Sequence, residues 1–206
     1  MSLKAKITLT ALLGATWVAA TVFGAHALLR YENAPGKVGH ITSAWPANSA
    51  IQQAPDRPTL VMLAHPQCPC TRASMGELAQ VMARVQGKVR AYVLFYTPRD
   101  AGVEWQNTDT RRSAAQIPGV TVLSDIDGAE AERFGAETSG HTFLFDENGQ
   151  LLFNGGITAS RGHSGDNIGE SSIASLIDKH ASSRAQTFVF GCSFKSRLRG
   201  DLKCPK

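Results

Sequence analysis

The residues from 59 to 96 restrict the fold more than any other part of the chain. Residues 59–64 form a short run that is apolar on both faces, which is typical of a central strand covered on both sides. Residues 69–85 place an apolar stripe along one side of a helix: Met75, Leu78, Val81, Met82 and Val85. Residues 89–96 then favour a second strand. Strand, helix and strand in so short a span predict a βαβ unit with a right-handed crossover.

The rest of the chain adds strands and short helices of the same kind. We expect helices over 111–117 and 127–134, strands over 120–123, 142–145 and 150–153, and a last helix from Asp166 or Asn167 to about residue 183. Asp146-Glu147-Asn148-Gly149 has the turn chemistry of a hairpin between the last two strands. The predicted fold class is therefore α/β, with helices on both faces of a central mixed sheet.

The N-terminal segment reads as a membrane helix. No Asp, Glu, Lys or Arg occurs from Ile7 to Leu29, a run long enough to cross about 30 Å of hydrocarbon. Lys4 and Lys6 precede it, so we expect that end in the cytoplasm and the rest of the chain outside. The alternative is a cleaved signal peptide, because Ala25-His26-Ala27 fits a cleavage site. Both interpretations export the domain to a compartment where disulfides persist.

These features divide the chain into five parts. We expect a cytoplasmic stretch (1–6), a single transmembrane anchor (7–29), an exported tether (30–57), the folded domain (58–184) and a basic tail (185–206). The tether is rich in proline, and we expect a short strand near 38–43 and packing of Trp45 on the domain.

The charge of the chain argues against a nucleic-acid partner. The net charge is +4, but much of the excess lies before the first apolar segment and in the last sixteen residues, so the body is near neutral. No basic stretch with interleaved aromatic residues occurs on the predicted domain. We interpret the basic tail as a solvated end; the less favoured alternative is a contact for anionic lipid headgroups. The sequence does not indicate an oligomeric state.

Two of the four cysteines stand at the junction of the first strand and its helix. If Pro69 is the first helical residue, Cys68 is the N-cap, and its sulfur faces the free N–H groups and positive dipole of the first turn, which favour a thiolate. Cys70 is close enough to resolve a mixed disulfide on Cys68. A Cys-x-Cys disulfide stiffened by Pro69 is expected to be strained and easily reduced.

The order of elements and this cysteine turn resemble the thioredoxin-like superfamily over residues 57–183. Ala64-His65-Pro66-Gln67-Cys68 stands where that family has its redox turn, and Phe143-Leu144-Phe145-Asp146-Glu147-Asn148-Gly149-Gln150 is similar to its later hairpin. The plan is similar to membrane-anchored TlpA-type oxidoreductases and to a bacterial group labelled RedB. The resemblance implies a thiol-disulfide oxidoreductase without a cofactor, anchored in a bacterial inner membrane, whose periplasmic domain acts on protein thiols or disulfides.

The chain departs from that family in two ways. The pair is Cys-x-Cys, and no proline occupies Ser139-Gly140-His141, where the family has a cis-proline. Gly140-His141-Thr142 also resembles the thioredoxin-like copper chaperones of cytochrome oxidase assembly, in which a His joins two cysteines. The alternative function is therefore a copper metallochaperone with Cys68, Cys70 and His141 as ligands.

Three other residues have two interpretations each. His65 either lowers the pKa of Cys68 or is an ordinary loop histidine, and His163 in the Gly-rich loop either approaches the cysteines or is solvated. Cys192 is a third redox thiol or metal ligand, or it pairs with Cys204 as a structural clip. A peroxiredoxin-type activity is less favoured, because no Thr-x-x-x-Cys precedes Cys68.

Overall fold

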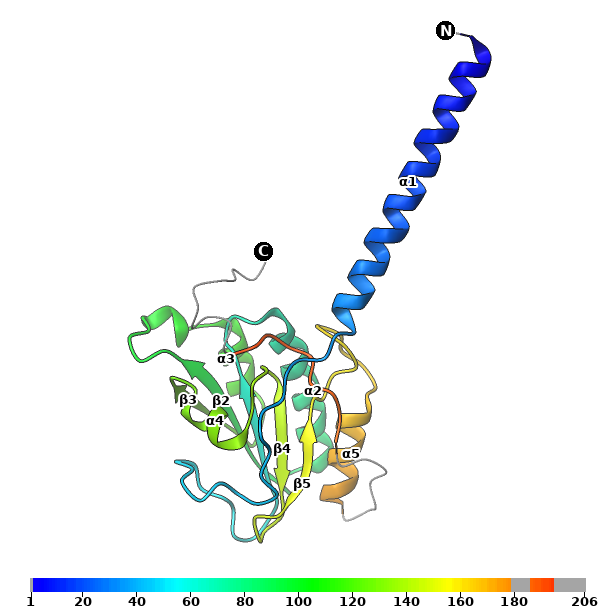
Figure 1. Cartoon of the computed structure of the whole chain (residues 1–206). Helices are drawn as coiled ribbons and strands as arrows, with labels where there is room; N and C mark the ends of the chain where they lie inside the picture. Colours follow the sequence, from blue (N-terminus) through cyan, green and yellow to red (C-terminus); the bar gives the residue numbers. More distant parts are fainter. Residues whose placement is uncertain (1, 179–185, 195–206) are drawn as a thin grey trace. The chain divides into compact units, whose positions relative to one another are not determined.

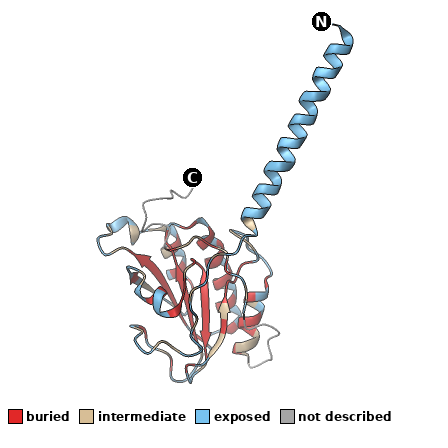
Figure 2. Ribbon diagram, viewed as in Figure 1, coloured by how far each residue is buried: buried red, intermediate tan, exposed pale blue. Residues whose placement is uncertain are grey.

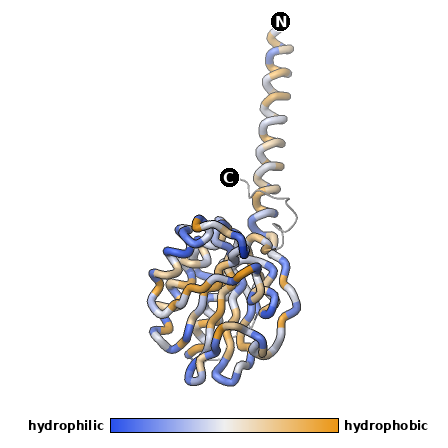
Figure 3. The backbone as a smooth tube through the Cα atoms, turned by 90° about the vertical axis from the view of Figure 1, so that its left-hand side faces the viewer, coloured by the Kyte–Doolittle hydropathy of each residue, from blue (hydrophilic) through white to orange (hydrophobic). Residues whose placement is uncertain are grey.

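The computed structural model describes residues 2–178 and 186–194, and it divides the chain into two compact units, 1–34 and 35–206. The first unit is helix α1 (Leu3–Glu32), whose N-cap Ser2 accepts a hydrogen bond from the Ala5 N–H. No residue of this helix is buried (Figure 2). Its length and composition suffice to cross a membrane, and a signal sequence meets the same criteria. Apolar residues occur along much of its length (Figure 3).

The second unit is built on a five-stranded sheet in the order β3-β2-β1-β4-β5 (Figure 1). The strands are β1 (Thr59–Ala64), β2 (Arg90–Thr97), β3 (Val120–Ile126), β4 (His141–Phe145) and β5 (Leu151–Gly155). Strands β1, β2 and β3 are parallel, whereas β4 runs antiparallel to both β1 and β5. Every residue of β1 is buried, as its uniformly apolar sequence predicts for a central strand.

Helices and loops cover both faces of this sheet. The helices are α2 (Pro69–Val85), α3 (Asp109–Ala115), α4 (Ala129–Phe134) and α5 (Ile168–Ile177), with a 3₁₀ turn at Val103–Trp105. The apolar stripe of α2 packs with α5 against one face, in a core that includes Leu78, Phe95 and Ile173. Helix α4 and the segment before β1 cover the other face.

The helices and strands predicted from residue 59 onward all form, with shifted ends at several of them. Helix α3 begins at Asp109 rather than 111, because the side chain of Thr108 caps it by accepting a hydrogen bond from the Arg111 N–H. Strand β3 continues to Ile126, since its pairing with β2 extends that far. Helix α5 begins after Asn167 as predicted and is described to Ile177; residues 179–183 lie outside the described residues.

The stretch that we expected to form a tether packs on the domain. Trp45 makes edge-on contacts with Phe134 and Phe145, at centroid distances of 5.3 and 5.1 Å, so its predicted packing is confirmed. Residues 38–43 are not a strand, because the segment makes only isolated bridges, Val38 with Ala136 and Ala44 with Gln150. The compact unit therefore begins at Pro35, ahead of the boundary at 58.

Candidate active site

The cysteine turn lies where β1 meets α2. Cys68 is the N-cap with extended backbone angles, and Pro69 occupies the first turn, as the sequence predicts. The Cys68 side chain makes no capping hydrogen bond with a helix N–H group. Its sulfur instead has hydrogen-bond partners on the side chains of α2 and on a segment that is distant in sequence.

One of these groups is the thiol of Cys192. Its Sγ lies 2.8 Å from the Sγ of Cys68, and no disulfide bond joins Cys68, Cys70 and Cys192 to one another. Cys192 belongs to an extended segment, residues 186–194, which we call the strap. Cys204 lies outside the described residues. The structure therefore brings a third cysteine, distant in sequence, to the redox turn.

This cluster shifts the ionisation of two thiols in opposite directions. A hydrogen bond from Cys192, a second from Cys70 and a third from Thr71 hold the pKa of Cys68 well below its usual range, despite burial. The hydrogen bond between Cys192 and Cys70 lowers the pKa of Cys70, but the neighbouring Cys68 and burial outweigh it and leave that pKa raised. The site therefore favours one thiolate, on Cys68, beside a protonated Cys70.

Three residues that the sequence did not single out support this cluster. The Ser139 hydroxyl accepts a hydrogen bond from the His65 N–H and shares another with Thr71, so it joins the cysteine turn to the start of β4. Arg161, from the Gly-rich loop, donates to the Gly191 carbonyl, and its charge acts to lower the pKa of Cys70. The sequence contains one signal for Arg161: it stands two residues before His163, which we had selected as a candidate in the same loop.

Two predicted histidines lie near the site with other contacts. The buried ring of His65 stacks on Tyr96, meets Trp105 edge-on, and accepts a hydrogen bond from the Gln67 N–H at Nδ1. The exposed His163 places its Nδ1 3.0 Å from the Arg161 carbonyl. His65 is thus packed within the turn, whereas His163 interacts within its own loop.

His141 is the first residue of β4 and is fully buried. Its ring stacks on Phe143 at 4.2 Å, and strand alternation puts both rings on the sheet face opposite α2. Burial lowers its pKa to about 3, against a weak opposing contact with the Asn154 side chain. Within residues 2–178 and 186–194, no group of three His, Cys, Asp or Glu side chains has a geometry that could hold a metal ion. The proposed copper ligands, Cys68, Cys70 and His141, are therefore not brought together.

Ser139-Gly140-His141 stands where thioredoxin-like proteins have a cis-proline, and its backbone conformation is different. Gly140 adopts a φ of +89°, and no cis peptide bond occurs among the described residues. Its N–H donates to the Leu63 carbonyl at 2.8 Å, at the end of β1. The start of β4 thereby stays close to the cysteine turn without a proline.

The strand order, the mixed pairing and a cysteine turn after the first strand decide the family of folds. The chain has a thioredoxin-like fold. Among solved structures, the thioredoxin-like domain is similar to a hypothetical protein from Sinorhizobium meliloti, at 16% identity and a TM-score of 0.58 over 77% of this chain and 98% of that one. An uncharacterized conserved protein from Geobacillus kaustophilus aligns at 15% identity and a TM-score of 0.55, over 79% of this chain and 92% of its own.

A secreted disulfide oxidoreductase from Mycobacterium tuberculosis aligns with the thioredoxin-like chain at 15% identity and a TM-score of 0.42, over 60% of this chain and 82% of that one. No protein-family model matches the chain, and no curated protein matches it.

Proposed function

We propose that this thioredoxin-like protein is a thiol-disulfide oxidoreductase that acts on exported proteins. One observation carries the proposal: the Cys68 sulfur has a depressed pKa and stands 2.8 Å from a second thiol at a strand-to-helix turn. A thiolate is the form that attacks a disulfide, and a neighbouring thiol is what completes the exchange. Electrons move only between sulfur atoms, so the reaction needs no cofactor.

The reaction begins at Cys68. Its thiolate attacks one sulfur of a protein disulfide, a mixed disulfide forms, and the other substrate sulfur leaves as a thiolate and takes a proton. A second thiol of the cluster then attacks Cys68 and releases the substrate as a dithiol. The reverse sequence oxidises a substrate dithiol, and the redox potential of the protein pair against that of its partner sets the direction.

The proposed place of this reaction is the periplasmic side of a bacterial inner membrane. Helix α1 supplies an apolar span, and Lys4 and Lys6 on its short N-terminal side favour retention of that end in the cytoplasm. Alkaline phosphatase fused after residue 57 should be active, and the chain should resist extraction by alkaline carbonate. An inactive fusion would contradict the topology.

Redox titration of the full chain in detergent tests the activity. In glutathione buffers, alkylation of the free thiols should reveal one two-electron equilibrium that involves Cys68. Cys68→Ser should abolish disulfide exchange with a model protein disulfide such as insulin, whereas Cys204→Ser, the matched control, should behave like the parent. Full exchange activity in the Cys68→Ser variant would overturn the proposal.

A further inference from the structure

The strap holds Cys192 as a bound peptide strand would be held. The Ser139 N–H donates to the Cys192 carbonyl at 2.8 Å, and the Phe194 N–H donates to the Glu137 carbonyl at 3.0 Å. These bonds flank an antiparallel bridge between Thr138 and Ser193. The backbone next to the cysteine turn thus already has a β-type partner, and the side chain which that partner presents is a thiol.

We propose that Cys192 is the resolving cysteine of this site, so that the redox cycle runs through a Cys68–Cys192 disulfide. This inference rests on the proposed oxidoreductase function and deepens it. The two sulfurs are 2.8 Å apart, whereas a disulfide bond is about 2.05 Å long. A small movement of the two side chains therefore suffices to form the bond.

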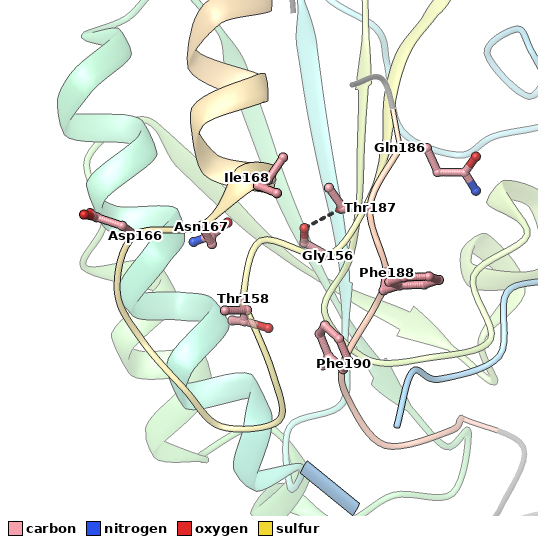
Figure 4. Close-up of a pocket in the computed structure, with 11 residues that line it drawn as sticks. Gly156, Thr158, Asp166, Asn167, Ile168, Gln186, Thr187, Phe188 and Phe190 are labelled. Atoms are coloured by element: carbon pink, nitrogen blue, oxygen red, sulfur yellow. Dashed lines mark hydrogen bonds between the residues drawn. The ribbon is translucent and has the colours of Figure 1, made fainter. Parts of the chain in front are cut away.

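The rest of the strap fixes the position of Cys192. Upstream, the backbone is held at four points: Thr187 N–H to the Asn154 carbonyl, Gly156 N–H to the Phe188 carbonyl, Gly36 N–H to the Val189 carbonyl, and Arg161 to the Gly191 carbonyl. The Thr187 hydroxyl also donates to the Gly156 carbonyl (Figure 4). Contacts on both sides of Cys192 restrict where its sulfur can lie, which favours reaction with Cys68.

Cys70 is less well placed for the same step. It lies in the first turn of α2 and also hydrogen-bonds to the Cys68 sulfur. A disulfide between these two cysteines would close a ring across a single residue, Pro69, whose fixed φ limits how far the turn can adjust. The raised pKa of Cys70 also leaves it mainly as a thiol, the less nucleophilic form.

The proposed step conserves atoms and electrons. After Cys68 has attacked a substrate disulfide, the Cys192 thiolate attacks the Cys68 sulfur of the mixed disulfide. The Cys68–Cys192 bond forms, the bond from Cys68 to the substrate breaks, and the substrate sulfur leaves as a thiolate that takes up the proton lost by Cys192. The substrate disulfide is reduced to two thiols, and the two protein thiols are oxidised to one disulfide.

The proposed reaction requires that a substrate can reach the Cys68 sulfur. Cys68 is 1% exposed, so a protein disulfide reaches it only when the strap moves. Gln186, Thr187, Phe188 and Phe190 line a pocket of about 750 Å³ together with the start of α5 (Figure 4). Among residues 186–190 only Val189 is buried. Displacement of this stretch therefore costs few apolar contacts.

Glutathione disulfide tests the inference in the full chain. In the parent, a glutathione adduct on Cys68 should be transient and should convert to a disulfide between the tryptic peptides that end at Arg72 and Lys195. Cys192→Ser should trap the adduct and slow glutathione release by about tenfold or more, whereas Cys70→Ser should still form the crosslink. Parental release from Cys192→Ser, with an internal Cys68–Cys70 disulfide, would overturn the inference and leave the proposed function standing. If Cys68 forms no adduct in any variant, the proposed function itself fails.

A glycine substitution tests the geometry without changing a sulfur. A Cβ on Gly191 would lie 2.0 Å from the Ser139 carbonyl oxygen, so Gly191→Ala must displace the strap. Resolution of the adduct should slow by about tenfold, while Cys68 should still attack glutathione disulfide and form the adduct. Gly76→Ala is the matched control, because its Cβ meets only the Ser164 hydroxyl at 3.9 Å. Equal resolution rates in the two variants would contradict the role of the strap.

Discussion

The Cys68 sulfur depends for its ionisation on a residue that is 124 positions away in the sequence. Cys192 is the largest contributor to its low pKa, ahead of Cys70 and Thr71. A short-range N-cap would give a thiolate whose properties stay fixed as long as α2 is folded. Here the properties of the thiolate depend on whether the strap is in place.

Cys192→Ala should therefore raise the pKa of Cys68, because it removes the strongest hydrogen bond to the thiolate. In the parent, the thiolate persists as the pH falls through the range in which ordinary thiols are protonated. In the variant, protonation should begin at higher pH, although Cys70 and Thr71 still favour the charged form. Ultraviolet thiolate absorbance during a pH titration measures this change.

The control for that titration is Cys204→Ser, which should titrate like the parent. The Cys192→Ala change should also be tested in a Cys70→Ser background. Cys70 then cannot contribute to the thiolate absorbance. Identical titrations with and without Cys192 would show that the hydrogen bond to Cys68 does not stabilise its thiolate.

The properties of a residue that depend on its sequence neighbours could be predicted, whereas those that depend on contacts between distant segments could not. Proline prefers the first helical turn, so the N-cap position of Cys68 follows from its neighbour alone. The role of His141 depends on register, since the face to which a strand residue points changes with each position. Its stacking on Phe143 and its place away from α2 emerge only when β4 is paired with β1.

At the scale of elements, helix α5 is tied to α2 by a buried polar contact. The Asn167 side chain caps α5 by accepting from the Glu170 N–H at 2.8 Å, and it donates to the Glu77 carboxylate at 3.1 Å. Glu77 is fully buried and also accepts from the Gly165 N–H. This contact fixes the end of the Gly-rich loop that carries Arg161.

Asn167→Ala should lower the free energy of unfolding by about 2 kcal/mol, because it removes a helix cap and a donor to a buried carboxylate. Urea denaturation of the parent and variant measures the difference. Asn107→Ala, at an exposed position, should change the stability by less than about 0.5 kcal/mol. Equal losses in the two variants would contradict the role of the cap.

The elements themselves were largely readable, because periodicity and turn residues act within a few positions. The uniformly apolar β1 and the one-sided stripe of α2 each identify their own environment. The segment from 35 to 58 has no period, and its packing depends on what the rest of the fold offers. Trp45 finds the rings of Phe134 and Phe145, which come together only in the folded domain.

At the scale of the whole molecule, the domain includes that segment. The Glu130 carboxylate accepts hydrogen bonds from the Ser49 hydroxyl and the Ala50 N–H, at 2.6 and 2.9 Å. Ile51 and Ala54 are buried beside them. The segment therefore covers part of the sheet face that α4 leaves open.

A chain beginning at Pro35 should fold and unfold cooperatively, whereas a chain beginning at Pro58 should be less stable by about 3–5 kcal/mol. The loss reflects the uncovered aromatic rings and the loss of the Ser49 and Ala50 hydrogen bonds to the Glu130 carboxylate. Denaturation followed by tryptophan fluorescence and circular dichroism compares the two chains. Equal midpoints would show that residues 35–57 are a tether after all.

Cys192 on the strap competes with substrate proteins for contact with Cys68. A thiol held on the same chain acts at an effective concentration of millimolar or more, whereas an exported substrate is far scarcer. The observed rate of exchange is then the rate of the open site multiplied by the fraction of time for which it is open. Anything that loosens or tightens the hold on residues 186–194 changes turnover and the choice of substrate, although it touches no sulfur atom.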